Sequence, residues 1–584
     1  MMGGETSVHN ARRTSATICL ALLPALLIGL SGCPGSSGKS PGASPPIVKT
    51  NGSADPTAQT TPLFLDVTEQ AGIAFKQSHG GCGLHYFPEQ VAAGAAVFDA
   101  NGDGNLDIYF PQPKPLGDCV GKTKGDFKQR LYLGDGKGHF RLAPNAFHGV
   151  ETDYGIGAAV GDYDNDGKPD LYVCCYGKNK LFHNNGDGTF TDVTKKAGLE
   201  VGGFSTGAVW FDYDGDGKLD LYVMRYCEWS VATDVVCYGP NNVRDSCNPH
   251  NYIASTNKLF HNNGDGTFSD VTVKSGAAPV RRRSLACAAV DYDGDGKIDL
   301  FVANDLGQNY LLHNNGDGTF TDMAIQENVA LGLNGNWQAN MGIAVGDYND
   351  SGKLSFLITT FANEPKTLYR NDGVAFSDVS DPAGLAAITR QYLSFGTGFI
   401  DTRNCGRLDV FFANGHISAF AYISDPQQTF KQQNKLLLNT GDGKFIETKG
   451  VLPENDVRVH RGACFGDFDN DGRMDILVTA SDDRPTLLHN ETKGGNWLLL
   501  KLVNKYGCAT PIGTRCTATV GARKLLRVVI GGGSYGGESD HRVHFGLGTA
   551  TKVEDVEIKW ISGKVQTLHD VPANQVLTVR EPAQ

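Results

Sequence analysis

Seven short segments of this chain combine aspartates and a glycine at a spacing that can surround a hard cation with oxygen atoms. The clearest segment runs from Asp162 to Asp170 and has the pattern D-x-D-x-D-G-x-x-D. Carboxylates at positions 1, 3, 5 and 9 supply the oxygen ligands that calcium prefers, and the glycine at position 6 lets the backbone turn sharply. The same nine-residue frame, sometimes degraded, recurs from these first residues: Asp99, Asp162, Asp212, Asp291, Asp347, Asp401 and Asp467. We call these segments the cation loops.

The cation loops differ in how many ligands they keep. Four have aspartate at all four positions, and the first has Asn101 at position 3, whose carbonyl oxygen can still bind an ion. The loop at Asp347 has a carboxylate at only one of its four ligand positions, so we expect it to be weak or empty. The loop at Asp401 has Arg403 and Cys405 at positions 3 and 5, so we expect it to be empty, with the guanidinium in place of the ion. About five calcium sites are therefore predicted, with these ligands: Asp99, Asn101, Asp103, Asp107, Asp162, Asp164, Asp166, Asp170, Asp212, Asp214, Asp216, Asp220, Asp291, Asp293, Asp295, Asp299, Asp467, Asp469, Asp471 and Asp475.

A helical calcium hand is the obvious competing interpretation, and its chemistry does not fit. That motif needs a bidentate carboxylate at position 12 and a helix on each side. Position 12 is apolar in all seven loops: Phe110, Val173, Val223, Val302, Ile358, Phe412 and Val478. The aspartate at position 9 must therefore close each site, in a loop between two β-strands. Because converging carboxylates repel one another until a cation binds, a structural role is favoured over a catalytic one.

The cation loops are embedded in a repeating pattern of strands. Successive loops begin 50 to 79 residues apart, which suits a four-stranded unit with insertions. A small apolar strand precedes each loop, as at residues 94–98, and a β-branched or aromatic strand follows it, as at residues 171–175. A third strand then meets a turn and a phenylalanine, as at residues 181–190, where Asn-Gly and Asp-Gly are hairpin signals. With 74 glycines in 584 residues, the chain is predicted to be all-β.

These repeats resemble the FG-GAP/VCBS repeats of integrin α-subunit propellers and their bacterial relatives. The resemblance implies a closed seven-bladed β-propeller over residues 63–492. The phrase at residues 64–72 precedes the first loop and recurs in variant form at residues 190–198 and 376–384. Since this phrase normally follows the hairpin of a blade, we expect the first and last blades to share strands and close the ring.

The pattern changes after the last repeat. Alternating strands such as residues 497–502 and 553–560 replace the loops, and the glycine-rich run 531–540 leads into residues 541–548. This part closely resembles the ASPIC/UnbV domain, which implies a second, smaller β domain over residues 493–582.

The N-terminal segment predicts export. Arg12 and Arg13 precede an apolar run that ends at Leu30-Ser31-Gly32-Cys33, which resembles a bacterial lipobox. We therefore predict a signal peptide over residues 1–33, lipidation of Cys33, a flexible linker over residues 34–62, and a location in the cell envelope. The alternative is a plain signal peptide with an incidental cysteine.

Cysteine usage agrees with an oxidising compartment. The chain has 14 cysteines, of which 12 remain after the signal and the lipid-bearing residue are set aside. The pairings closest in sequence are Cys508 with Cys516 and Cys237 with Cys247, followed by Cys82 with Cys119, and the alternative for several cysteines is simple burial. The net charge of -12 arises partly in the cation loops, where bound ions would cancel it, so no nucleic-acid partner is expected.

No catalytic arrangement stands out, although G-x-S-x-G occurs at residues 203–207 and 532–536 without the helix that this motif needs. His416, Arg458, His460 and Arg461 could line a propeller face, with hydrogen bonding inside turns as the plainer role. The long insertion at residues 226–257 is the best candidate for a ligand-contacting loop.

We therefore infer function from the cation loops, the export signal and the C-terminal domain taken together. We predict a binding, adhesion or scaffolding module for an extracellular protein or polysaccharide, attached to the membrane only through its lipid. The alternative is an enzyme acting on an extracellular polysaccharide or a secondary metabolite through the propeller channel or the domain junction. A third interpretation is a structural envelope protein with no specific ligand.

Overall fold

The computed structural model describes residues 60–583. The predicted signal peptide, Cys33 and nearly all of the predicted linker lie outside these residues. No helix in the described part of the chain is both long and apolar enough to cross a membrane.

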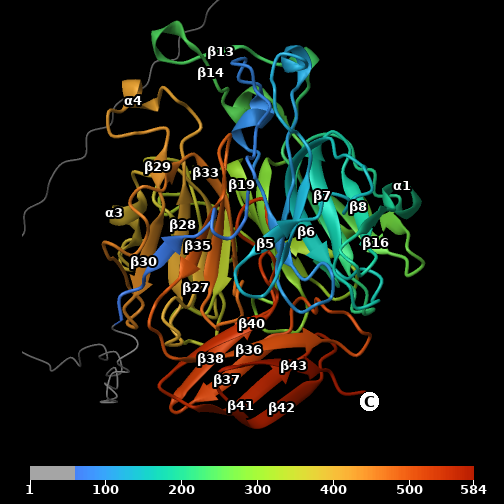
Figure 1. Cartoon of the computed structure of the whole chain (residues 1–584), viewed down its shortest axis with the longest axis vertical. Helices are drawn as coiled ribbons and strands as arrows, with labels where there is room; N and C mark the ends of the chain where they lie inside the picture. The colour runs from blue at the N-terminus through green and yellow to red at the C-terminus, as the bar shows by residue number, and fades with distance from the viewer. Residues whose placement is uncertain (1–59, 584) are drawn as a thin grey trace, which may run out of the picture. The chain divides into compact units, whose positions relative to one another are not determined.

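Within residues 60–583, seven antiparallel sheets follow one another along the chain, and we call the four-stranded core of each sheet a blade (Figure 1). The fourth sheet has two further short strands. The first four contain these strands: β2 (Ala96–Phe98), β3 (Asp107–Phe110), β4 (Arg130–Gly134) and β5 (Phe140–Leu142); β6 (Tyr154–Gly161), β7 (Asp170–Tyr176), β8 (Lys180–Asn184) and β9 (Phe190–Asp192); β10 (Ser205–Phe211), β11 (Asp220–Arg225), β16 (Lys258–Asn262) and β17 (Phe268–Asp270); β18 (Ser284–Val290), β19 (Asp299–Gly307), β20 (Tyr310–Asn314) and β21 (Phe320–Asp322). The last three contain these: β23 (Ile343–Gly346), β24 (Ser355–Ile358), β25 (Thr367–Asn371) and β26 (Phe376–Asp378); β27 (Ser394–Ile400), β28 (Asp409–Asn414), β30 (Lys435–Asn439) and β31 (Phe445–Glu447); β33 (His460–Gly466), β34 (Asp475–Ala480), β35 (Thr486–Asn490) and β1 (Phe64–Asp66).

The blades form a closed ring around a central axis. The first strand of each blade contacts the first strands of its two neighbours, in the cyclic order β2, β6, β10, β18, β23, β27, β33 and back to β2. The ring closes as the sequence predicts, because β1 is the outermost strand of the last blade and pairs Phe64 with Asn490 and Asp66 with Leu488. The predicted all-β class is confirmed, and this arrangement is a β-propeller.

The residue types of each strand follow from its place in the blade. The second strands, such as the hydrophobic run 171–175 in β7, are buried on both faces because a neighbouring blade covers each side. The third and fourth strands meet at a tight turn, where Gly186 and Gly188 have φ of 84° and 80°. These features confirm the strand and hairpin assignments made from the sequence.

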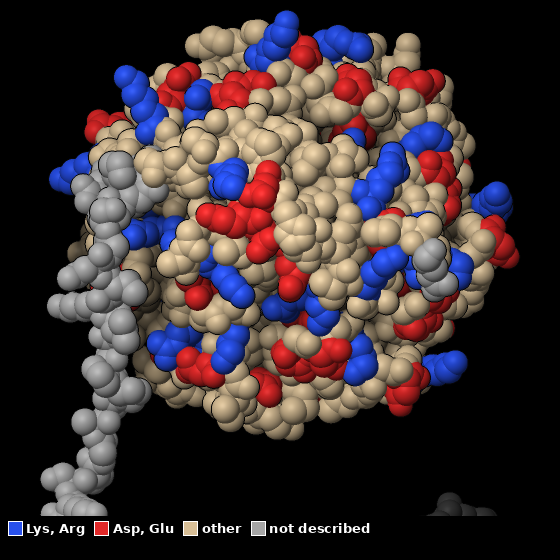
Figure 2. All heavy atoms as spheres, turned by 90° about the horizontal axis from the view of Figure 1, so that it is seen from below, with Lys and Arg blue, Asp and Glu red and all other residues tan. Residues whose placement is uncertain are grey.

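The C-terminal part folds into two further sheets. One has the order β40 (Val543–Gly548), β36 (Asn496–Val503) and β43 (Gln575–Arg580), and β36 and β43 are parallel. The other has the order β38 (Arg523–Val528), β37 (Arg515–Val520), β41 (Lys552–Lys559) and β42 (Val565–Pro572). Figure 2 shows the molecule from the side of this domain, where basic and acidic side chains are intermixed and no large area carries one sign.

Short elements decorate the edge of the ring opposite the C-terminal domain. The insertion at residues 226–257 holds the two-stranded pairs β12 (Cys227–Glu228) with β15 (Ile253–Ala254) and β13 (Cys237–Tyr238) with β14 (Arg244–Asp245) (Figure 1). Other short strands are β22 (Gln338–Ala339), β29 (Gln432–Gln433), β32 (Val457–Arg458) and β39 (Gly531–Gly532). The α-helices of the described residues each have four or five residues: α1 (Thr194–Ala197), α2 (Thr272–Ser275), α3 (Leu385–Thr389) and α4 (Ala421–Ser424).

Two of the three suggested disulfides are present. Cys82 is bonded to Cys119 and Cys237 to Cys247. The suggested pair of Cys508 and Cys516 is wrong, because both side chains are free and buried in different settings. Cys508 Sγ lies 3.7 Å from the carbonyl oxygen of Asp162 in the propeller, whereas Cys516 lies within β37 of the C-terminal domain.

Candidate metal centres and the closed central channel

Each cation loop connects the first and second strands of one blade, and the residue at position 9 begins the second strand. In the loop at Asp162, the two ends of the motif are held by backbone amides. Gly167 N donates to Asp162 Oδ2 at 3.0 Å, and Asn184 N donates to Asp170 Oδ1 at 2.8 Å. The carboxylates at positions 1 and 9 are therefore held by hydrogen bonds to the backbone, while those at positions 3 and 5 stand closer to solvent.

The structure brings the predicted ligands together. In the loop at Asp162, carboxylate oxygens of Asp162, Asp164 and Asp170 lie within 4.8 Å of one another. Burial raises the pKa of Asp162 and Asp170 to about 7, and repulsion from neighbouring aspartates adds to the effect. Burial likewise raises the pKa of Asp212 and Asp299 to about 6. Carboxylates in this setting are stabilised in their charged form by a nearby cation, so these loops fit a divalent ion.

A histidine that sequence reasoning missed faces each complete loop. His183 in β8 places Nδ1 3.2 Å from Asp170 Oδ1 and 3.3 Å from Asp164 Oδ2, without a well-aligned hydrogen bond. The same strand position faces the other complete loops as His261, His313 and His489. In the three degraded loops this position is Leu133, Arg370 or Leu438. The sequence carried this signal, because histidine recurs in Leu-Phe-His-Asn and related strands only where the loop is complete.

The Asp170 carboxylate, 3.2 Å from the imidazole nitrogen, raises the pKa of His183. The imidazole therefore adds a basic nitrogen, or a positive charge when protonated, to each complete carboxylate cluster. A nitrogen donor is one that transition metals accept more readily than calcium does.

The loop at Asp401 carries its own cation. The side chain of Arg403 is 4% exposed, and its Nη2 donates to Asp409 Oδ1 at 2.6 Å and to the carbonyl oxygen of Asn439 at 3.0 Å. Asp409 occupies position 9, the position whose aspartate closes each complete loop. The guanidinium therefore bonds to the residue that would close an ion site here, as the sequence predicted. In the loop at Asp347, the carboxylate of Asp347 accepts from Ser351 N at 2.8 Å and Gly352 N at 2.8 Å.

The C-terminal domain lies against the loop-bearing face of the propeller and touches all seven cation loops. Its residues reach the loops as follows: Lys501 Nζ lies 3.3 Å from Asp99 Oδ2; Ala509 N donates to Asp162 Oδ2 at 2.9 Å; the Tyr506 ring covers Gly217; Arg515 donates to the carbonyl oxygen of Asp291 at 3.0 Å; Arg523 donates to Asp350 Oδ2 at 3.0 Å and to the carbonyl oxygen of Cys405 at 2.7 Å; and Arg542 donates to the carbonyl oxygen of Asp467 at 2.9 Å. The conformation of the cation loops and the position of the C-terminal domain are therefore linked by direct contacts.

The glycine-rich segment 531–538 of the C-terminal domain, which we call the plug, fills the central channel. It pairs with the first strands around the ring at these positions: Gly531 and Gly532 with Ala289 and Ala288, Ser534 with Ile343, and Glu538 with Ala96. Ala158 N donates to the carbonyl oxygen of Gly536 at 3.3 Å, and Ser534 Oγ donates to the carbonyl oxygen of Ala463 at 2.7 Å. The plug explains the small residues of the first strands, since a Cβ at Gly94 would lie 1.9 Å from the Gly536 oxygen.

The plug bears on two expectations from the sequence. The alternative route for an enzyme through the channel is excluded along the filled part, because the backbone of the plug occupies it. The G-x-S-x-G match at residues 532–536 lies in this buried segment, where Ser534 bonds to backbone and has no histidine as its partner. It is therefore a packing element, in agreement with the interpretation of that match as incidental.

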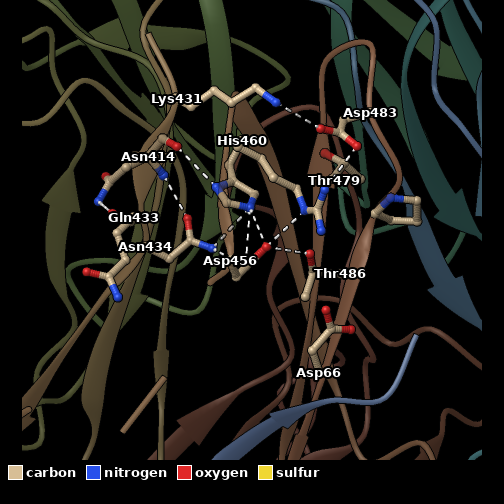
Figure 3. Close-up of polar contacts among 12 residues, drawn as sticks. Asp66, Asn414, Lys431, Gln433, Asn434, Asp456, His460, Thr479, Asp483 and Thr486 are labelled. Carbon is tan, nitrogen blue, oxygen red and sulfur yellow. Dashed lines mark hydrogen bonds and ion pairs between the residues drawn. The ribbon is translucent and has the colours of Figure 1, made fainter. Parts of the chain in front are cut away.

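The candidates near the ring closure are structural. Asp456 accepts hydrogen bonds from Arg458 Nε at 3.0 Å and Thr486 Oγ1 at 2.9 Å, and it lies 3.3 Å from His460 Nε2 (Figure 3). His460 is fully buried and its Nδ1 lies 3.2 Å from the carbonyl oxygen of Asn414, so the network ties the sixth blade to the seventh.

Two other candidates are also buried. Arg461 donates to the carbonyl oxygens of Gln90, Gly415 and His460. Nδ1 of His416 accepts from Ser418 N at 3.0 Å, and burial lowers the pKa of His416 to about 4. The plainer role considered for these residues is the one that the structure supports.

Comparisons with known proteins agree with this architecture. The FG-GAP-like repeat model matches residues 125–173, 162–223, 232–302, 291–358 and 401–478, and the ASPIC and UnbV model matches residues 508–584. This chain belongs to the FG-GAP repeat family and carries an ASPIC/UnbV domain. It is 27% identical over 303 residues to human cartilage acidic protein 1, an alignment that covers 49% of this chain and 42% of the human protein. The Xenopus tropicalis protein is 26% identical over 298 residues, with 49% and 43% covered. The chain thus spans less than half the length of these relatives.

Solved structures show only distant likeness. A lectin of Agrocybe aegerita that recognises non-reducing terminal N-acetylglucosamine is 16% identical, with a TM-score of 0.36, over 69% of this chain and 90% of the lectin. The Dos1 propeller is 8% identical, with a TM-score of 0.35, over 68% of this chain and 93% of that chain. TM-scores this low support no conclusion about the ligand of this chain.

Proposed function

We propose that this chain is an exported binding or scaffolding module, stabilised by calcium and held at the cell envelope by a lipid on Cys33. Its partner is an extracellular protein or polysaccharide. The C-terminal domain covers the cation-loop face and the plug fills the channel, so partner contact falls to the opposite face, which carries the 226–257 insertion. We call this the insertion face.

The observation that carries the proposal is the set of exposed apolar side chains on the insertion face. Tyr238 is 61% exposed and Trp337 is 56% exposed. Further exposed apolar residues on this face are Val231, Val235, Val236, Val243, Ile253, Leu333, Tyr422 and Phe430. Exposed aromatic and aliphatic groups gathered in neighbouring loops are typical of an interaction surface, and aromatic rings serve both protein and sugar ligands.

A capture experiment tests this proposal. The tagged full chain, purified in detergent, is immobilised with calcium and exposed to an envelope and polysaccharide extract, and bound and unbound fractions are compared by mass spectrometry. We expect a macromolecule to be retained by the native chain and lost from the Y238S/W337S variant. The matched control is V273S/V374S, which removes two side chains that are 96% and 92% exposed on the outer edges of blades. Equal retention by both variants would contradict the proposal.

The anchor has a separate test. Replacing Cys33 with Ser should release the protein from the membrane fraction into the soluble fraction, because a single acyl-bearing cysteine is the proposed attachment. Membrane association that persists in the C33S variant would count against lipidation.

An enzyme is the second candidate, and one contact favours it. On the insertion face, the hydroxyl of Tyr226 donates to Asp305 Oδ2 in a cavity that Glu364 also lines. A tyrosine and two carboxylates can serve as acid and base. A component of the unbound fraction that is shortened or altered by the native chain, and unaltered by the Y226F variant, would place the enzyme first.

A further inference from the structure

A cavity of about 280 Å³ lies at the insertion face, at the end of the channel beyond the plug. The insertion contributes one wall through residues 246–249, and the end of β19 and the loops after β24 and β28 contribute others. Phe395 and Val91 line the cavity, and Tyr535 at the tip of the plug packs behind both, with its ring 4.9 Å from that of Phe395 and its hydroxyl bonded to the carbonyl oxygen of Val91. The cavity is therefore closed from below by the C-terminal domain.

Most of the cavity wall is apolar, and two carboxylates interrupt it. The apolar side chains include Leu285, Met341, Phe361, Phe395 and Ile417. Asp305 is 7% exposed, and Glu364 Oε2 accepts from Ala339 N at 3.0 Å. Among residues 60–583, no Lys, Arg or His side chain lies within ion-pair distance of either carboxylate.

The basic groups closest to this cavity already have partners. Lys366, two residues after Glu364, is buried, and its ammonium donates to the carbonyl oxygens of Phe361 at 3.2 Å and Tyr392 at 2.5 Å. Its charge partly offsets the rise that burial causes in the pKa of Glu364, but its side chain does not line the cavity. Arg283 donates to the carbonyl oxygens of Pro249 and Tyr252, each at 2.9 Å. Arg461 lies over the outer face of the Phe395 ring at 4.3 Å, and its donors go to backbone carbonyls. Neither arginine lines the cavity. The wall therefore offers negative charge to a ligand and no free positive charge.

The Tyr226 hydroxyl donates to Asp305, but no cationic side chain of residues 60–583 pairs directly with either carboxylate. Ionising both in an apolar cavity is therefore costly unless a cation joins them. Burial raises the pKa of Asp305 to about 7, and the charge of Glu364 adds to the effect. Burial also raises the pKa of Glu364. An ammonium group placed beside the two carboxylates would stabilise the ionised form of each and lower both pKa values.

We propose that this cavity binds a small organic amine, whose ammonium group pairs with Asp305 and Glu364 and whose apolar body packs against Phe361, Phe395 and Met341. Aromatic walls suit this ligand further, because a cation is attracted to the face of a ring. The inference shares the insertion face with the proposed function, but it concerns a small molecule inside the cavity and not the macromolecule that contacts the exposed loops.

Calorimetric titration of the calcium-loaded full chain tests the proposal with three probes of similar size. These are 2-phenylethylamine, the neutral 2-phenylethanol and the anionic 3-phenylpropanoate. We expect the amine to bind with one-to-one stoichiometry, at least tenfold more tightly than the alcohol, and the carboxylate not to bind. Because the amine displaces protons from the carboxylates, its binding heat at pH 7 should also differ between buffers of different ionisation enthalpy.

Variants then test whether Asp305 and Glu364 bind the ammonium group. E364Q and D305N should each weaken amine binding at least tenfold and leave alcohol binding unchanged, whereas D381N, which removes an exposed carboxylate elsewhere, should leave both unchanged. E364Q is the safer variant for folding because Glu364 is only partly buried. The proposal would be overturned if the amine bound no more tightly than the alcohol, if the carboxylate bound more tightly than the amine, or if the amine did not bind at millimolar concentration. An unchanged amine affinity in a folded E364Q variant would also overturn it. Capture of a macromolecule by that same variant would show that the proposed function stands without it.

Discussion

The loops at Asp162 and Asp401 occupy the same place in two blades, and both bring aspartate carboxylates close together. They differ in how the repulsion between these carboxylates is offset. At Asp162, aspartate carboxylates converge and His183 approaches them, an arrangement that a cation from solution would stabilise. At Asp401, Arg403 supplies a positive charge from the chain itself and bonds to Asp409. The proposed calcium sites therefore predict that the loop at Asp162 depends on cations in the medium and that the loop at Asp401 does not. The predictions below test that difference.

Calcium removal should have the largest effect. With dissociation constants of about 0.1 to 1 mM, as in extracellular calcium modules, 1 mM calcium stabilises the fold by about 0.4 to 1.4 kcal/mol per site. Five loops together would contribute about 2 to 7 kcal/mol. We therefore expect EDTA to lower the melting temperature of the full chain, measured by differential scanning fluorimetry, and calcium to restore it. A melt that EDTA leaves unchanged would remove the argument for structural ions.

Replacing Arg403 with Met should destabilise the protein by about 3 to 5 kcal/mol, because it leaves Asp409 buried without its partner. The loss should be the same with calcium and with EDTA, since the missing charge was never supplied by solvent. Urea unfolding in both media measures it. Arg407 in the same loop is more exposed, so R407M should cost less than about 1 kcal/mol.

The reciprocal change sharpens this comparison. The R403D/C405D variant restores aspartate at all four ligand positions of the loop at Asp401. We expect this variant to be strongly destabilised in EDTA and substantially recovered in calcium. Equal destabilisation in both media would show that the loop type is fixed by its surroundings and not by these two residues.

Asp456 allows a pH-dependent test of a buried carboxylate that contacts basic side chains of the chain itself. Burial alone would raise its pKa, but His460, Thr486 and Arg458 lower the pKa to about 2. An unfolded aspartate has a pKa of about 4, so Asp456 contributes about 2 kcal/mol above pH 4, and this contribution is lost as pH falls toward 2. In urea unfolding, the difference between the native chain and D456N should shrink between pH 5 and pH 3. A difference that stays constant over this range would refute the assignment.

The four loop histidines should have the smallest effect. Replacing them together with Leu, the residue found at this position in two degraded loops, removes one nitrogen from each complete loop. Because nitrogen donors favour transition metals over calcium, the thermal stabilisation by Mn²⁺ should fall more than the stabilisation by Ca²⁺. An equal fall for both ions would show that the histidines act through charge and not as donors.

Much of the fold can be predicted from short sequence patterns. The rest depends on residues that are far apart in the sequence and meet only in the folded chain. The D-x-D-x-D-G-x-x-D spacing fixes a loop between strands by itself, and the phrase at residues 64–72 indicates the shared last blade by its displaced position. The role of Arg403 also followed from its place in the motif. The plug could not be found this way, because residues 531–538 contact strands from β2 to β33, and a glycine-rich run looks like an exposed loop in sequence. The carboxylates of the cavity, Asp305 and Glu364, meet only because two blades bring their loops together.

The plug also sets an order of assembly. The ring closes through β1 and β35, so the last blade cannot be completed until residues near 490 have been made. The central channel is filled later still, because residues 531–538 follow in the chain. A chain made from its N-terminus therefore forms its blades before the segment that packs against all their first strands is available.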